Sequence, residues 1–368
     1  MRKHYLFTLG AMIACSALST QARSPYLNYD PSDKTWDMHW DGSQLVQATT
    51  AKASDWMADL PDNMFVAHVS IPGTHNTMTG GDDPWVSASG PGCSTTQVAD
   101  LDEQLRRGIR ALDLRPGLYN AGDSDNPNWQ LRCNHGADVT KTLVSTAMTK
   151  MVNYLNAHPK EFLVLHLFRG NVYSQRPDNV AQALICYYDD ASKKRLNSMM
   201  NDVFNKGNVN AKVIEYRPNL TVGECRGKII ILRRDRIDFV NLPKAGYMTN
   251  WTTEFNAQNP GKVYNASDRI LATDLHMQDL SEGGDDVLYD QKIPQARALM
   301  QWAQTQPEPN AQYNLTKSYV APWVMNFTSI ENSGTSSRVD DNTNGYKGGS
   351  SVMNPNVCQY LDEHMGEG

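Results

Sequence analysis

Short apolar segments recur along the chain, and each is bounded by polar or turn-forming residues. The run at 162–168 is almost continuously apolar, and so is the run at 229–232. Runs of this length and composition are typical of strands that are buried on both faces. The segments that we predict as strands are 65–71, 109–114, 129–133, 162–168, 229–232, 270–273 and 320–327.

Apolar residues with a spacing of three and four occupy the stretches between these segments, and they predict helices. The predicted helices cover about 98–108, 140–158, 179–204 and 294–305. Repeated strand-then-helix order indicates a mostly parallel sheet. With seven or eight strands in one chain, we predict an α/β fold, an irregular TIM-type (β/α) barrel in a single domain. An open doubly wound sheet is the alternative, but no Gly-x-Gly-x-x-Gly follows the first strand and no Walker-type loop is present.

The first residues of the chain have the layout of a secretory signal peptide. A basic head at 1–4 precedes an apolar stretch at 5–18, and a small-x-small cleavage signal ends at Ala22. We therefore predict a signal peptide at 1–22, an irregular N-terminal arm at 23–54, the barrel at 55–368, and a secreted or periplasmic protein. A buried first helix is the alternative, and a lipoprotein anchored through Cys15 is a minor one.

Composition excludes several classes of protein. The 368 residues are 40% hydrophobic and 20% charged, which excludes a disordered chain, and the formal charge of −6 argues against a nucleic-acid partner. No apolar run approaches the roughly 18 residues of a membrane span. Export permits a disulfide between Cys93 and Cys133, although both can equally be small buried side chains.

Polar side chains follow the first two predicted strands, where barrel enzymes carry their reactive groups. Pro72-Gly73 forces a turn that places His75 outside the strand, and histidine is the usual general base near neutral pH. In the second strand, alternation puts Asp113 and Arg115 on one face, where together they could hold a phosphate. A surface-loop histidine and a structural ion pair are the alternative interpretations.

The third strand ends at His135, and Gly136 permits a ligand to approach it closely. Because the three strands are consecutive, we expect their ends to be neighbours. Two histidines beside an arginine can cleave a phosphodiester by internal attack. One imidazole accepts the proton of a neighbouring hydroxyl, the guanidinium offsets the charge on the phosphoryl oxygens, and the other imidazole protonates the leaving oxygen.

The motifs around these residues resemble the bacterial phosphatidylinositol-specific phospholipase C family. They are Ser-Ile-Pro-Gly-Thr-His at 70–75, Gly-Ile-Arg-Ala-Leu-Asp-Leu-Arg at 108–115, His-Gly at 135–136, and further matches at 56–63, 226–234 and 326–329. The resemblance covers about 55–360 and implies an irregular TIM-type barrel. It implies that His75 is the general base on the inositol 2-hydroxyl and that Arg115 binds the phosphate, with Asp113 beside it. It also implies that His135 is the general acid that releases diacylglycerol.

The resemblance further implies that Arg234 and Asp279 contact the inositol, with Asp274 as an alternative to Asp279. Asn76 stands where bacterial members usually carry an aspartate. In calcium-dependent relatives such an asparagine is a metal ligand, but those relatives have a carboxylate where Arg115 stands. We therefore assign Asn76 to substrate binding, and we expect catalysis without a metal and without a cofactor.

Two further departures concern the substrate and the chain's end. Phe168 stands near the position of an inositol-contacting lysine of the metal-independent members, and the aromatic residue after their Gln-Asp is missing. In the family, a strand after the last helix carries an aspartate that supports the base; either the barrel predicted here lacks this last strand, or the support comes from another residue.

From the motifs and the resemblance we predict a phosphodiesterase that releases diacylglycerol and a cyclic inositol phosphate from phosphatidylinositol-like lipids. We expect a monomer that contacts a phospholipid surface transiently. The alternatives are a phosphodiesterase for another phospholipid or a glycerophosphodiester, and a non-catalytic headgroup-binding protein.

Overall fold

The computed structural model describes residues 38–40, 45–47, 53–87, 94–123, 125–136, 138–168, 190–234, 240–265, 272–306, 321–332 and 346–364. The predicted signal peptide, Cys15 and Cys93 lie outside these ranges. Within the predicted N-terminal arm, β1 (Met38–Trp40) and β2 (Leu45–Gln47) form an antiparallel pair.

The centre of the fold is an eight-stranded sheet with the order β15-β13-β12-β11-β10-β9-β5-β3. Five of its pairings are parallel, while β12 is antiparallel to both of its neighbours. The predicted α/β, TIM-type fold is confirmed. The strands are β3 (Gly73–Thr74), β5 (Ala111–Leu114), β9 (Leu163–Leu167), β10 (Ile229–Arg234), β11 (Gly246–Thr249), β12 (Gly261–Asn265), β13 (Ala272–Gln278) and β15 (Trp323–Asn326).

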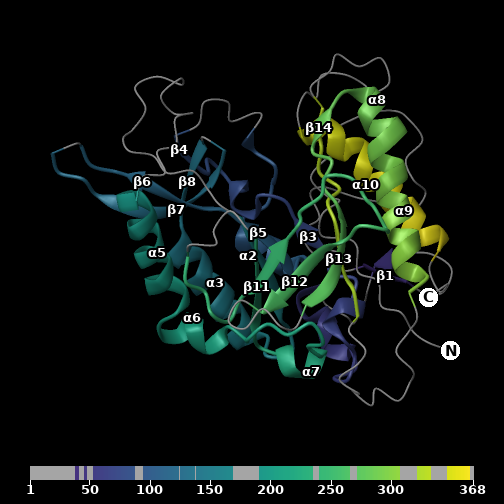
Figure 1. Ribbon diagram of the computed structural model, residues 1–368, viewed down its shortest axis with the longest axis horizontal. Helices are drawn as coiled ribbons and strands as arrows, with labels where there is room; N and C mark the ends of the chain where they lie inside the picture. The colour runs from purple at the N-terminus through teal and green to yellow at the C-terminus, as the bar shows by residue number, and fades with distance from the viewer. Residues whose placement is uncertain are drawn as a thin grey trace.

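Helices cover the sheet from two sides (Figure 1). On one side lie α3, α5 and α6, and the apolar face of α3 packs onto β9 and β10 through residues such as Met148, Leu165 and Ile231. On the other side α9 packs against β13 and β15, and α10 packs against α9. The helices are α2 (Leu101–Arg106), α3 (Val144–Ala157), α5 (Asp190–Phe204), α6 (Gly207–Lys212), α7 (Val222–Cys225), α8 (Asp285–Val287), α9 (Ile293–Gln304) and α10 (Tyr346–Glu363).

The segment predicted as the third barrel strand belongs to a different sheet, so this prediction was wrong. Strand β7 (Trp129–His135) lies in a four-stranded antiparallel sheet with the order β4-β8-β7-β6, which Figure 1 shows beside the barrel. An apolar run predicts a strand but does not specify the partner with which that strand pairs. The other members are β4 (Trp85–Ser87), β6 (Pro116–Asn120) and β8 (Asp138–Leu143).

The first predicted strand was also wrong over most of its length. Residues Val66–His68 form a 3-10 turn, η3, and the barrel strand is only Gly73–Thr74. Phe65 and Val66 are buried, and the Val66 N–H donates to the Leu220 carbonyl rather than to a sheet neighbour. The apolar pattern therefore predicted burial correctly, but in the turn the backbone groups form hydrogen bonds outside the barrel sheet.

Several boundaries follow from hydrogen bonding that the pattern does not contain. The stretch predicted as one helix at 140–158 begins as β8 and becomes α3 only at Val144, because Leu143 still pairs with Arg132. The helices predicted at 98–108 and 294–305 are confirmed as α2 and α9, and α5 covers the second half of the one at 179–204. Cys133 and Cys225 are buried free thiols.

A buried ion pair joins the first helical segment to the barrel. Arg110 and Glu161 are both fully buried, and Arg110 Nε donates to Glu161 Oε2 at 2.7 Å. The second oxygen of Glu161 accepts from the backbone N–H of Met57 at 2.9 Å, in the 3-10 helix η2 (Ala53–Asp59). These bonds fix the start of β5. The other end of this strand, which contributes to the site described below, is thereby held in position. None of the described helices is long and apolar enough to cross a membrane.

Candidate active site

The turn after β3 holds His75 from both sides. Next to it, Asn76 adopts the left-handed conformation with φ of 47°, which asparagine tolerates better than most residues. The Asn76 N–H donates to Asp113 Oδ2 at 3.0 Å. The His75 carbonyl accepts from Thr96 Oγ1 at 2.8 Å and from Gln97 Nε2 at 2.7 Å. The imidazole is therefore carried on a backbone that hydrogen bonds with Asp113, Thr96 and Gln97 constrain.

Asp113, at the end of β5, is the centre of the cluster. Its carboxylate accepts from Arg115 Nε at 3.1 Å and lies 3.0 Å from a terminal guanidinium nitrogen of the same residue. The side chain is 3% exposed. Burial alone would raise its pKa, but the charge of Arg115 and contact with His166 hold the pKa of Asp113 well below its usual value. The carboxylate is therefore ionised and fixes the guanidinium.

His75 faces two hydrogen-bond donors. Its Nε2 lies 2.8 Å from a guanidinium nitrogen of Arg115 and 3.0 Å from Asn76 Nδ2, and both groups donate. Nε2 is therefore the unprotonated nitrogen of a neutral imidazole. Burial and the charge of Arg115 lower the pKa of His75 well below its usual value, while Asp113, 3.9 Å away, opposes the shift. A neutral imidazole is the form that accepts a proton.

His135 reaches the same cluster from the side sheet. Its ring centroid lies 5.9 Å from that of His75, with the two planes at 75°. Its Nδ1 donates to the Ser94 carbonyl at 2.8 Å, which fixes the orientation of the ring. Burial lowers the pKa of His135, and the Ser94 hydrogen bond opposes the shift. The structure thus brings His75, Arg115 and His135 together, although not through consecutive barrel strands.

A second pair of charges lies beside this cluster. Arg234, at the end of β10, has a guanidinium nitrogen 3.9 Å from Asp279 Oδ2. The same oxygen accepts from Trp251 Nε1 at 2.9 Å. Burial raises the pKa of Asp279, and the Trp251 hydrogen bond and the charge of Arg234 oppose the rise. Asp274, the alternative to Asp279, lies instead on the surface in an ion pair with Lys262.

Stacked aromatic rings and guanidinium groups connect the Asp113–Arg115 pair to the Arg234–Asp279 pair. Arg234 lies over Trp251 at 3.6 Å and over Phe168 at 4.2 Å from the ring centroids, and Arg115 lies over Phe168 at 5.1 Å. His166 stacks on Trp251, with centroids 5.3 Å apart and planes at 12°. Phe168, a departure from the family motif, therefore stands between the two arginines. We call these five residues the ring–guanidinium stack.

The sequence analysis missed two residues of this stack. His166 lies within β9, and its Nδ1 is 3.3 Å from Asp113 Oδ1. A histidine inside an otherwise apolar run was the signal, because strand alternation places it two positions before Phe168 on the same face. Trp251 follows β11, a strand that was not predicted because its glycine and polar residues break the apolar pattern. Nothing in the local sequence marks Trp251.

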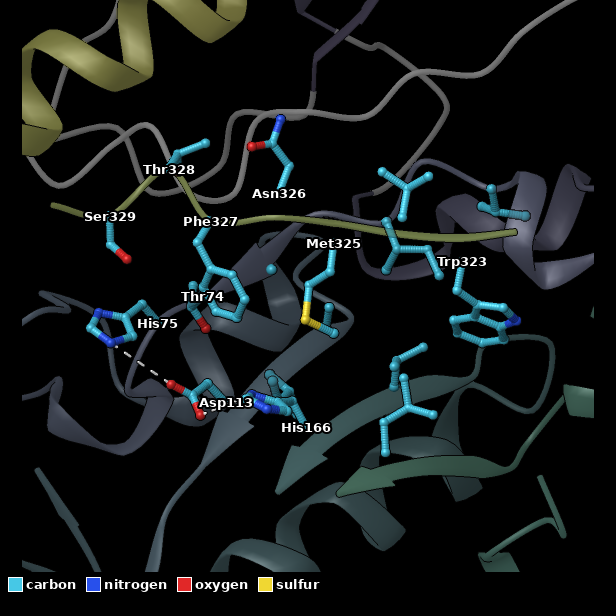
Figure 2. Close-up of a pocket in the computed structure, with 18 of the residues that line it drawn as sticks. Thr74, His75, Asp113, His166, Trp323, Met325, Asn326, Phe327, Thr328 and Ser329 are labelled. Carbon is cyan, nitrogen blue, oxygen red and sulfur yellow. Dashed lines mark ion pairs between the residues drawn. The ribbon is translucent and has the colours of Figure 1, made fainter. Parts of the chain in front are cut away.

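The cluster opens into a cavity of about 250 Å³ between the edge strands β3 and β15. Figure 2 shows His75 and Asp113 at one end of it and Trp323 at the other, with Phe327 and His166 between them. Most of its wall is apolar, including Ile71 and Met325. A pocket of this kind, apolar with a few convergent polar groups at one end, is typical of a small-molecule site. Among the described residues, no group of three or more His, Cys, Asp or Glu side chains is arranged to hold a metal ion.

Comparison with solved structures identifies the fold of this protein. The fold is that of bacterial phosphatidylinositol-specific phospholipases C. The Staphylococcus aureus protein matches with a TM-score of 0.60 and 18% identity, over 85% of this chain and 87% of that chain. The Listeria monocytogenes protein matches with a TM-score of 0.53 and 18% identity, over 85% and 89%.

Sequence comparison identifies individual proteins to which the chain is similar, although no protein-family model matches it. It is 28% identical to the 1-phosphatidylinositol phosphodiesterase of Listeria monocytogenes over 191 residues, which is 52% of this chain and 54% of that protein. It is 30% identical to mouse PI-PLC X domain-containing protein 1 over 138 residues, 30% of this chain and 38% of that protein. The chain thus matches about half or less of the length of these relatives. The resemblance predicted from the motifs is confirmed, and the chain is a homologue of the Listeria protein.

Proposed function

We propose that this protein is a phosphodiesterase that cleaves phosphatidylinositol-like lipids to diacylglycerol and a cyclic inositol phosphate. The observation that carries the proposal is the convergence of a neutral imidazole, a second imidazole and a carboxylate-fixed guanidinium. These are His75, His135 and Arg115, of which His75 lines the apolar cavity. The similarity to the Listeria phosphodiesterase supports the same reaction class.

The proposed reaction uses each group once. His75 Nε2 accepts the proton of the inositol 2-hydroxyl, and that oxygen attacks phosphorus. The bond from phosphorus to the glycerol oxygen breaks, and His135 Nε2 gives its proton to that oxygen. Because the hydroxyl and the phosphate belong to one ring, the attack is intramolecular and has a large effective concentration. Arg115 leaves the His75 imidazole and binds the phosphoryl oxygens, while Asp113 keeps hold of its Nε.

The neighbouring residues provide the remaining contacts in this proposal. Arg234 and Asp279 offer a donor and an acceptor to the inositol hydroxyls, and the ring–guanidinium stack keeps Arg234 rigid. Asn76 contacts the base histidine rather than open solvent, since it is 2% exposed. In this proposal Asn76 remains a substrate-binding residue: its amide leaves the lone pair of His75 Nε2 when that nitrogen accepts the hydroxyl proton, and it then contacts the headgroup.

The charge of Arg115 stands where a calcium ion would otherwise stabilise the phosphate, so we propose a reaction without metal and without cofactor. The partner is a phospholipid surface that a monomer contacts transiently. The predicted signal peptide directs the protein to a secreted or periplasmic location, where such a lipid is reached from outside. A lipoprotein is the minor alternative.

One observation favours a second substrate class. Phe168 fills the space between the two arginines, where a smaller or charged side chain would leave room for another contact to inositol. A different phospholipid or a glycerophosphodiester therefore stays a candidate, as does headgroup binding without turnover. A panel of these lipids separates the candidates, because each predicts a different product or none.

The test is a phosphorus NMR time course with phosphatidylinositol vesicles and the variants His75→Ala and His135→Ala. We expect the wild type to form a cyclic phosphate and each variant to lose at least about 100-fold in rate. His364→Ala, near the end of α10 and outside the cavity, is the matched control and keeps wild-type activity. Unchanged cyclic phosphate release by either active-site variant would overturn the proposal.

A further inference from the structure

A lysine is buried next to the site and has no role in the reaction described above. Lys292 is 0% exposed, and its Nζ has no hydrogen-bond partner among the described residues. Burying an unpaired ammonium group is costly, so such residues are rare unless a ligand or partner offsets the cost. The local backbone is also unusual, because Leu288–Lys292 form a single π-helical turn, η6, just before α9. Such turns often occur at functional sites.

The packing of α9 places Lys292 near the mouth of the barrel. One turn further along the helix, the Ala296 carbonyl accepts from Asn326 Nδ2 at 3.0 Å. Asn326 is the last residue of β15, and it also accepts from Gln278 Nε2 at the end of β13. Residues four apart share a helix face, so Lys292 lies on the face that meets these strand ends. Asp279 follows directly after Gln278.

Electrostatics connect Lys292 to both halves of the site. Burial lowers the pKa of Lys292 to about 7, and the charge of Asp279 opposes part of that shift. In the other direction, the charge of Lys292 contributes to lowering the pKa of His75, and it opposes the rise in the pKa of Asp279. Asp279 and His75 are the described titratable groups with which Lys292 interacts in this way.

Each of the two arginines described above faces a carboxylate. Arg115 is paired with Asp113 at 3.0 Å, and Arg234 faces Asp279 at 3.9 Å. These four groups sum to no net charge, whereas a phosphodiester carries one negative charge. A protonated Lys292 adds one positive charge to these four groups.

We propose that Lys292 is a headgroup-binding residue of this site and that it is charged when an anionic phosphodiester is bound. The inference rests on the proposed function for the identity of the headgroup. Without the ligand, the ammonium group loses its proton readily because it is buried and unpaired. With the ligand, the negative charge holds the proton on Nζ. Binding at neutral pH therefore takes up a fraction of a proton.

The experiment measures binding separately from turnover. The probe is the methyl phosphodiester of 2-deoxy-myo-inositol, which lacks the attacking hydroxyl and carries one charge that does not titrate near pH 7. Titration calorimetry at pH 7 in two buffers with different ionisation enthalpies gives the affinity and the number of protons taken up. The variants are Lys292→Met and Lys292→Arg, and Lys150→Met is the matched control, since Lys150 pairs with Asp102 on the surface.

We expect the wild type to take up a fraction of a proton and Lys292→Met to bind about 10- to 100-fold more weakly. Lys292→Arg should retain most of the affinity and lose the part of the proton uptake that belongs to Lys292, because arginine is always charged. Lys150→Met should match the wild type. Thermal unfolding gives a further test. A purely structural role of Lys292 predicts that Lys292→Met is less stable than the wild type, whereas we expect this variant to be as stable as the wild type or more stable.

The failure of this inference differs from failure of the proposed function. Equal affinity and equal proton uptake in Lys292→Met overturn the inference, even when phosphatidylinositol is cleaved. A loss of stability in Lys292→Met without a loss of affinity also overturns it. Proton-coupled binding without any turnover overturns only the proposed enzyme activity. If the wild type does not bind the probe, the inference is overturned, and cleavage of phosphatidylinositol in the NMR time course decides the proposed function separately.

Discussion

At the scale of single residues, the site depends on which oxygen each donor reaches. Asp113 Oδ2 receives the Asn76 N–H and Arg115 Nε, while Oδ1 faces His166 at 3.3 Å. The same arginine reaches His75 Nε2 at 2.8 Å. One carboxylate thus sets the positions of a turn, a guanidinium and, through them, an imidazole.

Replacement of Asp279 distinguishes it from Asp274. We expect Asp279→Asn to lower kcat/KM for phosphatidylinositol by about 10- to 100-fold, because a charged acceptor facing the headgroup is lost. Asp274→Asn should have little effect, since Asp274 is exposed and pairs with Lys262. Steady-state kinetics on both variants provides the comparison. A larger loss in Asp274→Asn would place the headgroup elsewhere.

The two histidines predict the pH dependence. The proposed reaction needs His75 neutral and His135 protonated, and burial lowers the pKa of both below the usual value of about 6.5. Activity is therefore lost on the acid side as His75 becomes protonated, and on the basic side as His135 loses its proton. We expect kcat/KM to be highest below pH 6.5 and to fall about tenfold per pH unit well above it. A plateau that extends to pH 8 would contradict this assignment.

At the scale of elements, His135 shows how two sheets build one site. The barrel strands β3, β5 and β10 supply His75, Arg115 and Arg234, whereas the antiparallel sheet supplies His135 from the end of β7. Gly136, with φ of 54°, makes the tight connection to β8 that leaves His135 at the edge of that sheet. The position of His135, the proposed general acid, therefore depends on how the side sheet packs on the barrel.

The ion pair between Arg110 and Glu161 ties β5 to the start of β9 and to η2. Glu161→Ala leaves Arg110 as an unpaired buried charge, so we expect a loss of about 3–5 kcal/mol in the free energy of unfolding. Denaturant unfolding measures this. Glu224→Ala, which removes an exposed helix-capping interaction at α7 and a surface ion pair with Arg217, should cost about 1 kcal/mol or less. Equal effects of the two substitutions would show that the buried pair does not anchor β5.

At the scale of the whole molecule, the proposed reaction relies on the chain's own cations. In these proposals Arg115 and Lys292 provide the positive charge near the phosphate, so we expect a chelator such as EDTA to leave turnover within about twofold of its starting value. Added calcium should not raise turnover. The measurement is the initial rate on phosphatidylinositol vesicles after dialysis against chelator. A tenfold loss that calcium restores would contradict the metal-independent reaction.

Much of the fold was predictable because burial leaves a local pattern. The apolar runs that became β9 and β10 and the periodic stretches that became α3 and α9 are recognisable without neighbours. Strands such as β11 and β12 were missed because glycine and polar residues interrupt them, and tertiary pairing holds them in the sheet. The pairing partner of β7 was wrong for the same reason, because pairing is not a local property.

The amino-acid sequence by itself determined the types of reactive groups and the turns that present them. The Pro-Gly turn before His75 and the alternation of Asp113 and Arg115 are local, so they could be identified from neighbours in the chain. Only the tertiary structure decided that His166 contacts Asp113, that Trp251 and Phe168 enclose Arg234, and that Lys292 is buried beside them. Contacts between distant segments depend on how helices and sheets pack, and no spacing along the chain encodes them.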